Sequence, residues 1–246
     1  MLLGLVGSEM CIRDRRFAIM NTVQDRKFKI GDPILEVNNI SLSFGGVNAI
    51  TDTSFNVLEH EVRAIIGPNG AGKSSMLNCI NGIYKPQQGS IAFKGNTLSK
   101  ITPNIIAQMG ISRTFQNLAL FKRMSAIDNI LVGRKLHSKA NFIDVAFQLP
   151  KARKEEKQNL KKCEEIVEFL EIEKIKNTPV GKLPYGLQKR VELGRALATE
   201  ASLLLLDEPM AGMNVEEKRE MCRFILEVNE AVSYTHLTLP RVGKCR

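Results

Sequence analysis

One stretch constrains what this chain can fold into more than any other: residues 67–75 read "GPNGAGKSS" and fit the pattern G-x-x-x-x-G-K-[ST]. The apolar run "VRAIIG" at 62–67 precedes it and is typical of a strand buried on both faces. A stretch of helical character, "KSSMLNCINGI", follows it. A strand, a glycine-rich turn and a helix in this order direct successive backbone N–H groups at phosphate groups. The sequence therefore predicts a nucleotide-binding α/β domain.

The residue types inside this loop indicate how it would hold a nucleotide. Its glycines let the backbone curl, Lys73 reaches the β- and γ-phosphates as a positive charge, and Ser74 offers its hydroxyl oxygen to Mg²⁺. A chance glycine-rich turn is the alternative, but the preceding strand and the Lys-Ser pair argue against it. The residues expected to bind the nucleotide are Gly67, Pro68, Asn69, Gly70, Ala71, Gly72, Lys73, Ser74 and Ser75.

A pair of acids ends the apolar strand predicted at 202–209, which reads "SLLLLDEP". Open α/β sheets bind their ligands at the carboxyl ends of strands, where these acids would lie. We expect Asp207 to hold Mg²⁺, directly or through water, and Glu208 to polarise an attacking water. The alternative is a plain strand-exit turn, which becomes less attractive with the phosphate loop in the same chain.

Other patterns outline the remaining secondary structure. Alternation of apolar and polar residues predicts half-buried antiparallel strands at 34–44 and 53–58, and 90–95 is expected to be another edge strand. Thr102 and Pro103 start a short helix, and 110–116 has strand character. Between about 119 and 186 the chain becomes helical, and the helices expected from there on are at 150–172, 187–201 and 215–230.

Composition limits the class of protein without choosing its partner. A chain of 246 residues with 43% hydrophobic residues can bury a full core, and no apolar run is long enough to span a bilayer. Five cysteines without a CxxC pair favour reduced thiols in a cytosolic compartment. A net charge of +9 would suit a nucleic acid, an anionic membrane surface or a polyphosphate. His60 and His137 are isolated and are expected to be surface residues.

With these motifs in place, residues 33–230 resemble an ATP-binding cassette (ABC) subunit. The resemblance implies an α/β fold: a P-loop NTPase core, in which helices flank a mixed sheet, with an antiparallel β edge and an inserted α-helical subdomain at about 119–186. It also implies that Gln116 in "SRTFQN" completes the Mg²⁺ shell and senses the γ-phosphate. By the same resemblance Phe44 in "SFGG" stacks on the adenine, with a core phenylalanine as the alternative.

The family's Leu-Ser-Gly-Gly-Gln signature is matched imperfectly by "LPYGLQKR" at 183–190. The resemblance implies that Gly186 and the helix after it contact ATP held by a second subunit. Pro184 removes a hydroxyl and an N–H from this segment, so the shared site is weakened. Together "SFGG", "ISRTFQN", "LPYGLQKR" and "DEPMAGMN" are similar to the ATP-binding subunits of branched-chain amino acid importers.

This similarity implies cofactors and partners. They are ATP and Mg²⁺, transmembrane permease subunits, a second ABC subunit and, indirectly, a periplasmic solute-binding protein, with the chain at the cytoplasmic face of the membrane and no nucleic acid bound. The segment "NLALFKRMSAIDNILVG" resembles the surface that receives a coupling helix, with plain helix packing as the alternative. Two other functions stay open: a nucleic-acid- or ribosome-associated ABC ATPase, and a module that binds ATP without hydrolysing it.

The two ends of the chain do not resemble the cassette. Residues 1–19 are expected to be a non-native extension before Met20, residues 20–231 the cassette, and residues 232–246 a non-native tail. Both ends resemble translated adapter sequence. His236 lies too soon after the helix at 215–230 to end a buried strand, so it does not match the family's switch histidine. We therefore expect a truncated cassette that keeps an ATP-binding half-site but, without the switch histidine and final strands, hydrolyses ATP poorly or folds marginally.

Overall fold

The structure is a computed structural model that describes residues 2–5, 31–98, 102–114, 118–137 and 150–233. The chain divides into two compact units. Unit 1 comprises Met1–Ile106 and Leu205–Ala211, and unit 2 comprises Ala107–Leu204 and Gly212–Arg246. The chain passes from unit 2 into unit 1 within strand β8, Leu203–Asp207.

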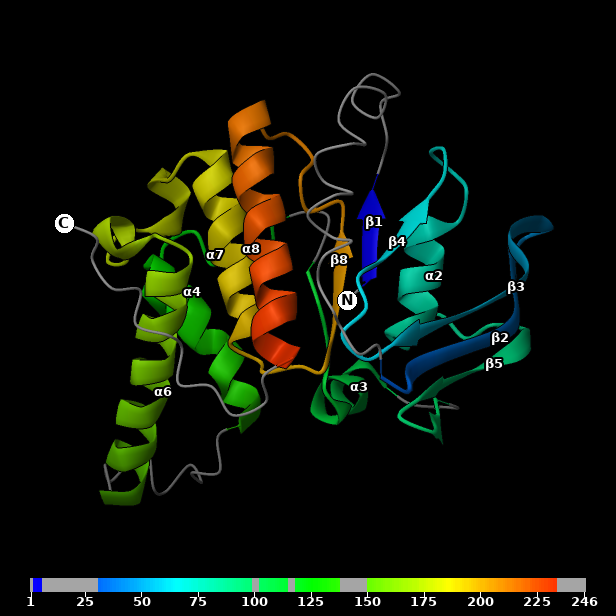
Figure 1. The fold of residues 1–246 in the computed structure, drawn as a ribbon, viewed down its shortest axis with the longest axis horizontal. Coiled ribbons are helices and arrows are strands. Elements are labelled where there is room, and N and C mark those ends of the chain that lie inside the picture. The colour runs from blue at the N-terminus through cyan, green and yellow to red at the C-terminus, as the bar shows by residue number, and fades with distance from the viewer. Residues whose placement is uncertain (1, 6–30, 99–101, 115–117, 138–149, 234–246) are drawn as a thin grey trace. The chain divides into compact units, whose positions relative to one another are not determined.

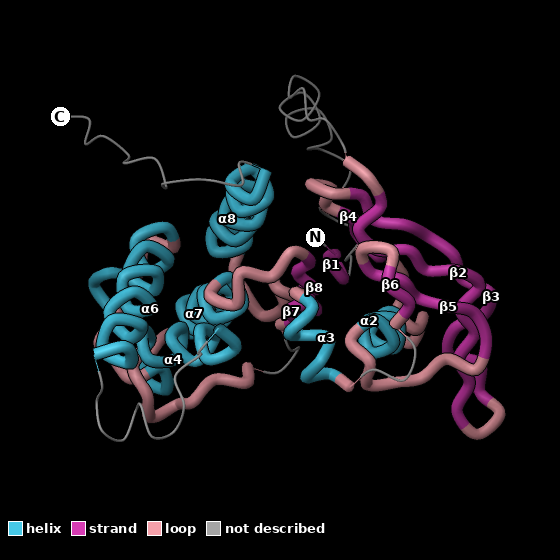
Figure 2. Tube along the Cα trace, turned by 90° about the horizontal axis from the view of Figure 1, so that it is seen from below, coloured by secondary structure: helices cyan, strands magenta, loops and turns pink. Residues whose placement is uncertain are grey.

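An antiparallel sheet forms the larger part of unit 1 (Figures 1 and 2). Its strands are β2 (Pro33–Phe44), β3 (Val47–Leu58), β5 (Gln88–Phe93) and β6 (Asn96–Thr97), in the order β3-β2-β5-β6. The predicted antiparallel pairing of the first two strands is confirmed. The strand predicted at 90–95 is confirmed as β5, but its predicted edge position is wrong, because the turn at Lys94–Gly95 adds β6 outside it.

Parallel strands carry the sequence motifs of unit 1 (Figure 1). Strand β1 (Leu2–Leu5) pairs on one side with β4 (Arg63–Ile66) and on the other with the last residues of β8. The prediction that the strand before the phosphate loop is buried on both faces is wrong, since Ile66 at the end of β4 is 70% exposed. Along β4, Ile66 lies on the opposite face from Arg63 and Ile65, and those two residues are half-buried. One face of the strand is therefore covered better than the other.

The placement of β1 differs from the sequence analysis, which assigned no element to residues 1–19. A four-residue apolar run such as "LLGL" has too little length or periodicity to be distinguished from other apolar segments. Residues 6–19 of the expected extension and 234–246 of the expected tail, including His236, lie outside the described residues.

Helices make up most of unit 2 (Figures 1 and 2). They are α4 (Ala126–Gly133), η1 (Arg134–His137), α6 (Pro150–Phe169), η2 (Glu173–Ile175), η3 (Val180–Lys182), α7 (Tyr185–Leu197) and α8 (Val215–Ser233). Helix α4 packs on α6 and α7, and Gly194 of α7 lets Ile130 and Leu170 approach closely. The helices predicted at 150–172, 187–201 and 215–230 are confirmed, with ends displaced by a few residues.

A short helix and a short strand follow β6 in the chain. Helix α3, Pro103–Met109, begins where Thr102 and Pro103 predicted, with the Ile106 N–H bonded to the Thr102 carbonyl. Strand β7, Ile111–Arg113, lies within the predicted 110–116, and residues 115–117 are outside the described part of the chain. Among the described residues, no helix is long and apolar enough to cross a membrane.

Candidate functional site

The phosphate loop of unit 1 joins β4 to helix α2, Lys73–Ile80. Gly70 and Gly72 have φ angles of 86° and 80°, which side-chain-bearing residues rarely adopt. A Cβ on Gly72 would also overlap the Ala49 carbonyl of β3, so the loop passes directly against that strand. The glycine pattern therefore reflects a tight turn seated on the antiparallel sheet.

Lys73 begins α2 and is buried, with 9% of its surface exposed. Its ammonium group donates hydrogen bonds to the carbonyls of Gly67 at 2.6 Å and Pro68 at 2.7 Å, and thus folds back over the loop. The start of α2 has no acidic residue in its first turn and no side-chain cap. A helix start of this kind leaves its backbone N–H groups and partial positive charge available to an anion.

The acids lie at the end of β8, also in unit 1. Asp207 is 3% exposed and ends the strand, as predicted. The β1 register sets Gly4 opposite both Asp207 and Ile65, so Asp207 is level with the end of β4, two strands away. With strands about 4.8 Å apart, Asp207 and the phosphate loop stand roughly 10 Å apart at the same edge of the sheet.

Glu208 has a left-handed backbone with φ 47°, which the sequence did not predict. Non-glycine residues in this region cost roughly 1–3 kcal/mol and are concentrated at functional sites. The Ala211 N–H bonds to the Glu208 carbonyl and closes a turn directly after the strand. This turn re-aims the chain immediately after Asp207. No sequence signal indicates it, because glutamate has no preference for the conformation.

The side chains predicted to hold a metal have the chemistry that Mg²⁺ prefers over softer metals. The Ser74 hydroxyl and the Asp207 carboxylate carry hard oxygen atoms of the kind that suit Mg²⁺. Within the described ranges, no three His, Cys, Asp or Glu residues gather as a metal cluster. Gln116, the third expected Mg²⁺ ligand and a predicted catalytic residue, lies outside the described residues.

Phe44 ends β2 at the turn of the β2–β3 hairpin and is 45% exposed. This exposure differs from what a core phenylalanine would show. Opposite it in β3 is Val47, two residues before Ala49, the residue that the phosphate loop contacts. Phe44 therefore lies at the end of the hairpin whose second strand contacts the phosphate loop, and much of its ring is exposed.

A hollow of about 340 Å³ that the sequence did not indicate lies between β3, β4 and the start of α2. Ile50, Phe55, Arg63 and Lys73 are among the residues that line it. The hollow reaches Arg63 at the start of β4, whereas phosphates bind beyond the end of that strand, so the hollow differs from the phosphate site.

Cys79 in α2 is a buried cysteine. Burial raises the pKa of its thiol to about 11, so this residue packs as a small apolar side chain.

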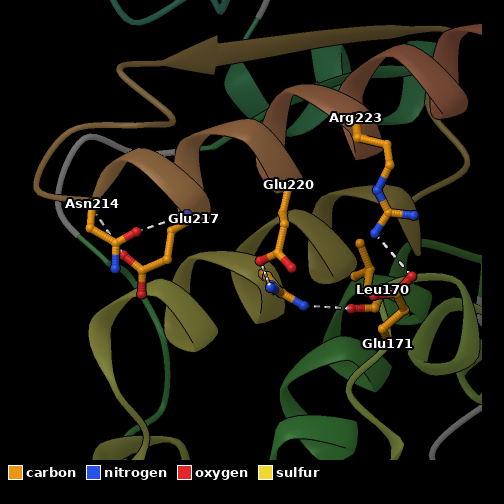
Figure 3. Close-up of polar contacts among 7 residues, drawn as sticks. Leu170, Glu171, Asn214, Glu217, Glu220 and Arg223 are labelled. Atoms are coloured by element: carbon orange, nitrogen blue, oxygen red, sulfur yellow. Dashed lines mark hydrogen bonds and ion pairs between the residues drawn. The ribbon is translucent and has the colours of Figure 1, made fainter.

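Gly186 belongs to unit 2, where it is the second residue of α7 and is buried. Pro184 precedes the helix as its N-cap and supplies no side-chain hydrogen bond, as expected from the loss of the hydroxyl. The start of α8 faces this helix through Glu217, and Arg190 of α7 pairs with Glu220 of α8 (Figure 3). The structure thus attaches the predicted signature segment to α8.

Residues 50–211, which include the phosphate loop and the acids, match the family profile described as ABC transporter. The chain belongs to the ABC transporter family. The match spans both the phosphate loop and the acidic strand end, and the expected P-loop NTPase fold is confirmed by the cassettes that the chain resembles in structure.

Two relatives and one solved structure show how far the ABC likeness extends. The high-affinity branched-chain amino acid transport ATP-binding protein BraF of Pseudomonas aeruginosa is 36% identical over 207 residues, 84% of this chain and 81% of BraF. The high-affinity branched-chain amino acid transport ATP-binding protein LivG of Escherichia coli is 33% identical over 210 residues, which are 85% of this chain and 82% of LivG. The ADP conformation of MJ1267, an ATP-binding cassette of an ABC transporter, gives a TM-score of 0.70 at 32% identity, covering 81% of this chain and 78% of MJ1267.

Proposed function

We propose that this chain is the ATP-binding and ATP-hydrolysing subunit of an importer for branched-chain amino acids or a related small polar or amphipathic solute. The observation that carries the proposal is the phosphate loop of α2, level with Asp207 at one edge of the sheet, in a chain 36% identical to BraF. The solute is inferred from the relatives' names, and the chemistry from the chain's own residues.

Each site residue has a distinct task in this proposal. The loop N–H groups and the Lys73 ammonium bind the β- and γ-phosphates, where phosphate oxygens replace the Gly67 and Pro68 carbonyls as acceptors. Ser74, Asp207 and Gln116 would hold Mg²⁺, which supplies charge neutralisation at the phosphates. Glu208 accepts a proton from the water that attacks the γ-phosphate, and Phe44 stacks on the adenine.

The proposed assembly places the cassette of residues 20–231, with its helical subdomain at about 119–186, on the cytoplasmic face of the inner membrane. Its partners are permease subunits, a second cassette whose ATP Gly186 contacts and, indirectly, a periplasmic solute-binding protein. The segment before and within α4 exposes Phe121, Lys122 and Arg123, which support contact with a membrane partner. The net charge of +9 is compatible with a position at an anionic membrane surface.

Phosphate release tests the enzymatic part of this proposal. The Glu208→Gln variant keeps the size of the side chain and removes its basicity, so MgATP binding should persist while steady-state phosphate release falls about 100-fold or more. Equal turnover by both proteins would remove Glu208 from its proposed role. Binding without turnover in the unaltered chain would favour a non-hydrolysing module, and salt-dependent DNA binding in a gel shift would favour the nucleic-acid class.

The transport part needs the membrane partners. Permease and solute-binding-protein genes beside this gene would identify them, and co-reconstitution in proteoliposomes should then give ATP-dependent uptake of labelled leucine. The Lys73→Ala variant is the control that should abolish uptake. Uptake of another solute class, with leucine neither transported nor competing, would contradict the proposed substrate.

A further inference from the structure

The exposed ring of Phe44 is held in place by a loop that no sequence motif singled out. The turn after it, Gly45–Gly46, has φ angles of 52° and 90° and open space on the Cβ side of both residues. By itself, such a turn would leave an aromatic side chain at the hairpin end free to reorient. Residues that follow helix α2 supply the restraint.

Gln87 fixes the backbone directly before the ring. Its side-chain oxygen accepts a hydrogen bond from the Ser43 N–H at 3.0 Å, and its side-chain nitrogen donates to the Ser43 carbonyl at 3.0 Å. Its own backbone N–H bonds to the Ser41 carbonyl at 3.0 Å. One amide side chain therefore pairs with both polar groups of one residue, a geometry that leaves the peptide before Phe44 little freedom to rotate.

Tyr84 fixes the ring itself. The two ring centroids lie 5.1 Å apart with an interplanar angle of 71°, an edge-to-face contact of the kind that adds roughly 0.5–1.5 kcal/mol to burial alone. Tyr84 is half-buried, whereas Phe44 remains 45% exposed. The contact thus holds one side of the Phe44 ring and leaves much of its surface available to a flat ligand.

The same loop is attached to the phosphate-binding helix. The backbone N–H groups of Ile83 and Tyr84 both bond to the Asn78 carbonyl in α2, at 2.9 and 3.2 Å. Helix α2 has eight residues and starts at Lys73. A single short helix therefore carries the phosphate-binding lysine at its start and the two restraints on Phe44 just after its end.

We propose that Gln87 and Tyr84 are positioning residues that hold Phe44 as a platform for the nucleobase at a fixed place relative to the phosphate loop. The inference rests on the proposed role of Phe44 in stacking on adenine. Restraining the ring before binding lowers the ordering cost of the complex. Losing either restraint should therefore weaken the base-dependent part of affinity and leave the phosphate-dependent part unchanged.

The chain contains no tryptophan, so Phe44→Trp creates a single fluorescent reporter at the platform. In this background MgATP should change the tryptophan emission, and magnesium tripolyphosphate, which lacks a base, should bind without changing it. Adding Gln87→Ala or Tyr84→Leu should raise the Kd for MgATP about fivefold, with the tripolyphosphate Kd, measured by calorimetry, unchanged. Tyr84→Phe, which keeps the ring, and Gln88→Ala, an exposed glutamine next along the chain, are the matched controls and should retain the parent Kd.

The outcomes separate this inference from the function on which it rests. If the reporter responds to MgATP but the Gln87 and Tyr84 variants bind it as the parent does, or lose both ligands equally, the positioning role is overturned and the platform survives. If calorimetry shows MgATP binding and the reporter does not respond, Phe44 is not the platform: its stacking role and the positioning inference both fall, while the proposed ATP-binding function stands. Thermal unfolding of each variant establishes that the compared proteins are folded.

Discussion

The carboxylate of Glu217 in α8 occupies the space that a Cβ on Gly186 of α7 would fill. Glu217 is held there by a reciprocal pair of hydrogen bonds with Asn214: it accepts from the Asn214 N–H at 3.0 Å, and its own N–H donates to the Asn214 side-chain oxygen at 2.9 Å (Figure 3). This capping box starts α8. The start of α7 is therefore shaped by the N-terminal cap of α8, the helix that follows Asp207 and Glu208 in the chain.

The Gly186→Ala substitution should lower the free energy of unfolding by about 1 kcal/mol, because the new methyl group displaces Glu217 from its cap. In a Glu217→Ala background the same substitution should instead stabilise by up to about 1 kcal/mol, since alanine favours a helix over glycine. Urea unfolding of the four proteins measures both effects. A cost for Gly186→Ala that is the same in both backgrounds would contradict the proposed overlap.

Asn129 is fully buried in α4 and organises the segment before that helix. It accepts from the Phe121 N–H at 2.8 Å and donates to the carbonyls of Phe121 at 3.1 Å and Ser125 at 2.9 Å. Asn129→Leu should lower the free energy of unfolding by about 2–4 kcal/mol, because buried backbone groups lose their partners. Urea unfolding measures the loss, and Arg123→Ala, an exposed residue in the segment before the same helix, is the control. A loss below about 1 kcal/mol would show that water replaces the side chain.

Glu200 should make stability depend on acid pH. Burial alone would raise its pKa, but hydrogen bonds and charges from Lys162 and Arg134 outweigh burial and lower the pKa below its ordinary value. A lowered folded-state pKa contributes stability above about pH 4.5 that is lost as pH falls further. The side chain is 45% exposed, so the contribution should stay below about 1 kcal/mol. Urea midpoints between pH 3 and 7 should fall less steeply for Glu200→Gln, and parallel curves would contradict this.

Strand β1 gives the expected N-terminal extension a testable role. It pairs with β4 along four residues and with β8 along three. A chain that starts at Met20 lacks these pairings and should unfold at lower urea concentration, with a loss of several kcal/mol at roughly 1 kcal/mol per hydrogen bond. Gly4→Pro, which removes one strand N–H, should act in the same direction, with Gly4→Ala as its control. Unchanged unfolding of the shortened chain would contradict this stabilising role of β1 and would agree with a cassette that begins at residue 20.

The phosphate loop, the apolar acid strand and the antiparallel hairpin could be predicted because each has a strong local pattern. Lys73 at the helix start and Asp207 at the strand end lie where the motifs indicated. The double burial of β4 could not be read correctly, because an apolar run does not show how many layers cover it, and Ile66 is exposed. The inner position of β5 in the sheet could not be predicted, because the strand outside it, β6, has only two residues and leaves no pattern in the sequence.

The residues that hold the site residues in place were harder to predict than the site residues themselves. Gln87 and Glu217 act through contacts with residues distant in sequence, Ser43 and Gly186, and neither belongs to a motif that describes those partners. The left-handed backbone of Glu208 also follows from the turn around it rather than from the residue type. Gln116 stays a prediction from resemblance.

Equilibrium binding of MgATP, followed by titration calorimetry, tests the central claim most directly. The unaltered chain should bind MgATP, and Lys73→Ala should weaken binding about 10- to 100-fold through the loss of charge-assisted hydrogen bonds worth about 1.5–3 kcal/mol. Lys85→Ala, an exposed lysine in the loop after α2, is the matched control and should bind as the parent does. Equal affinity of the Lys73→Ala variant and the parent, with both folded by thermal unfolding, would contradict the assignment of the loop at 67–75 as the nucleotide site.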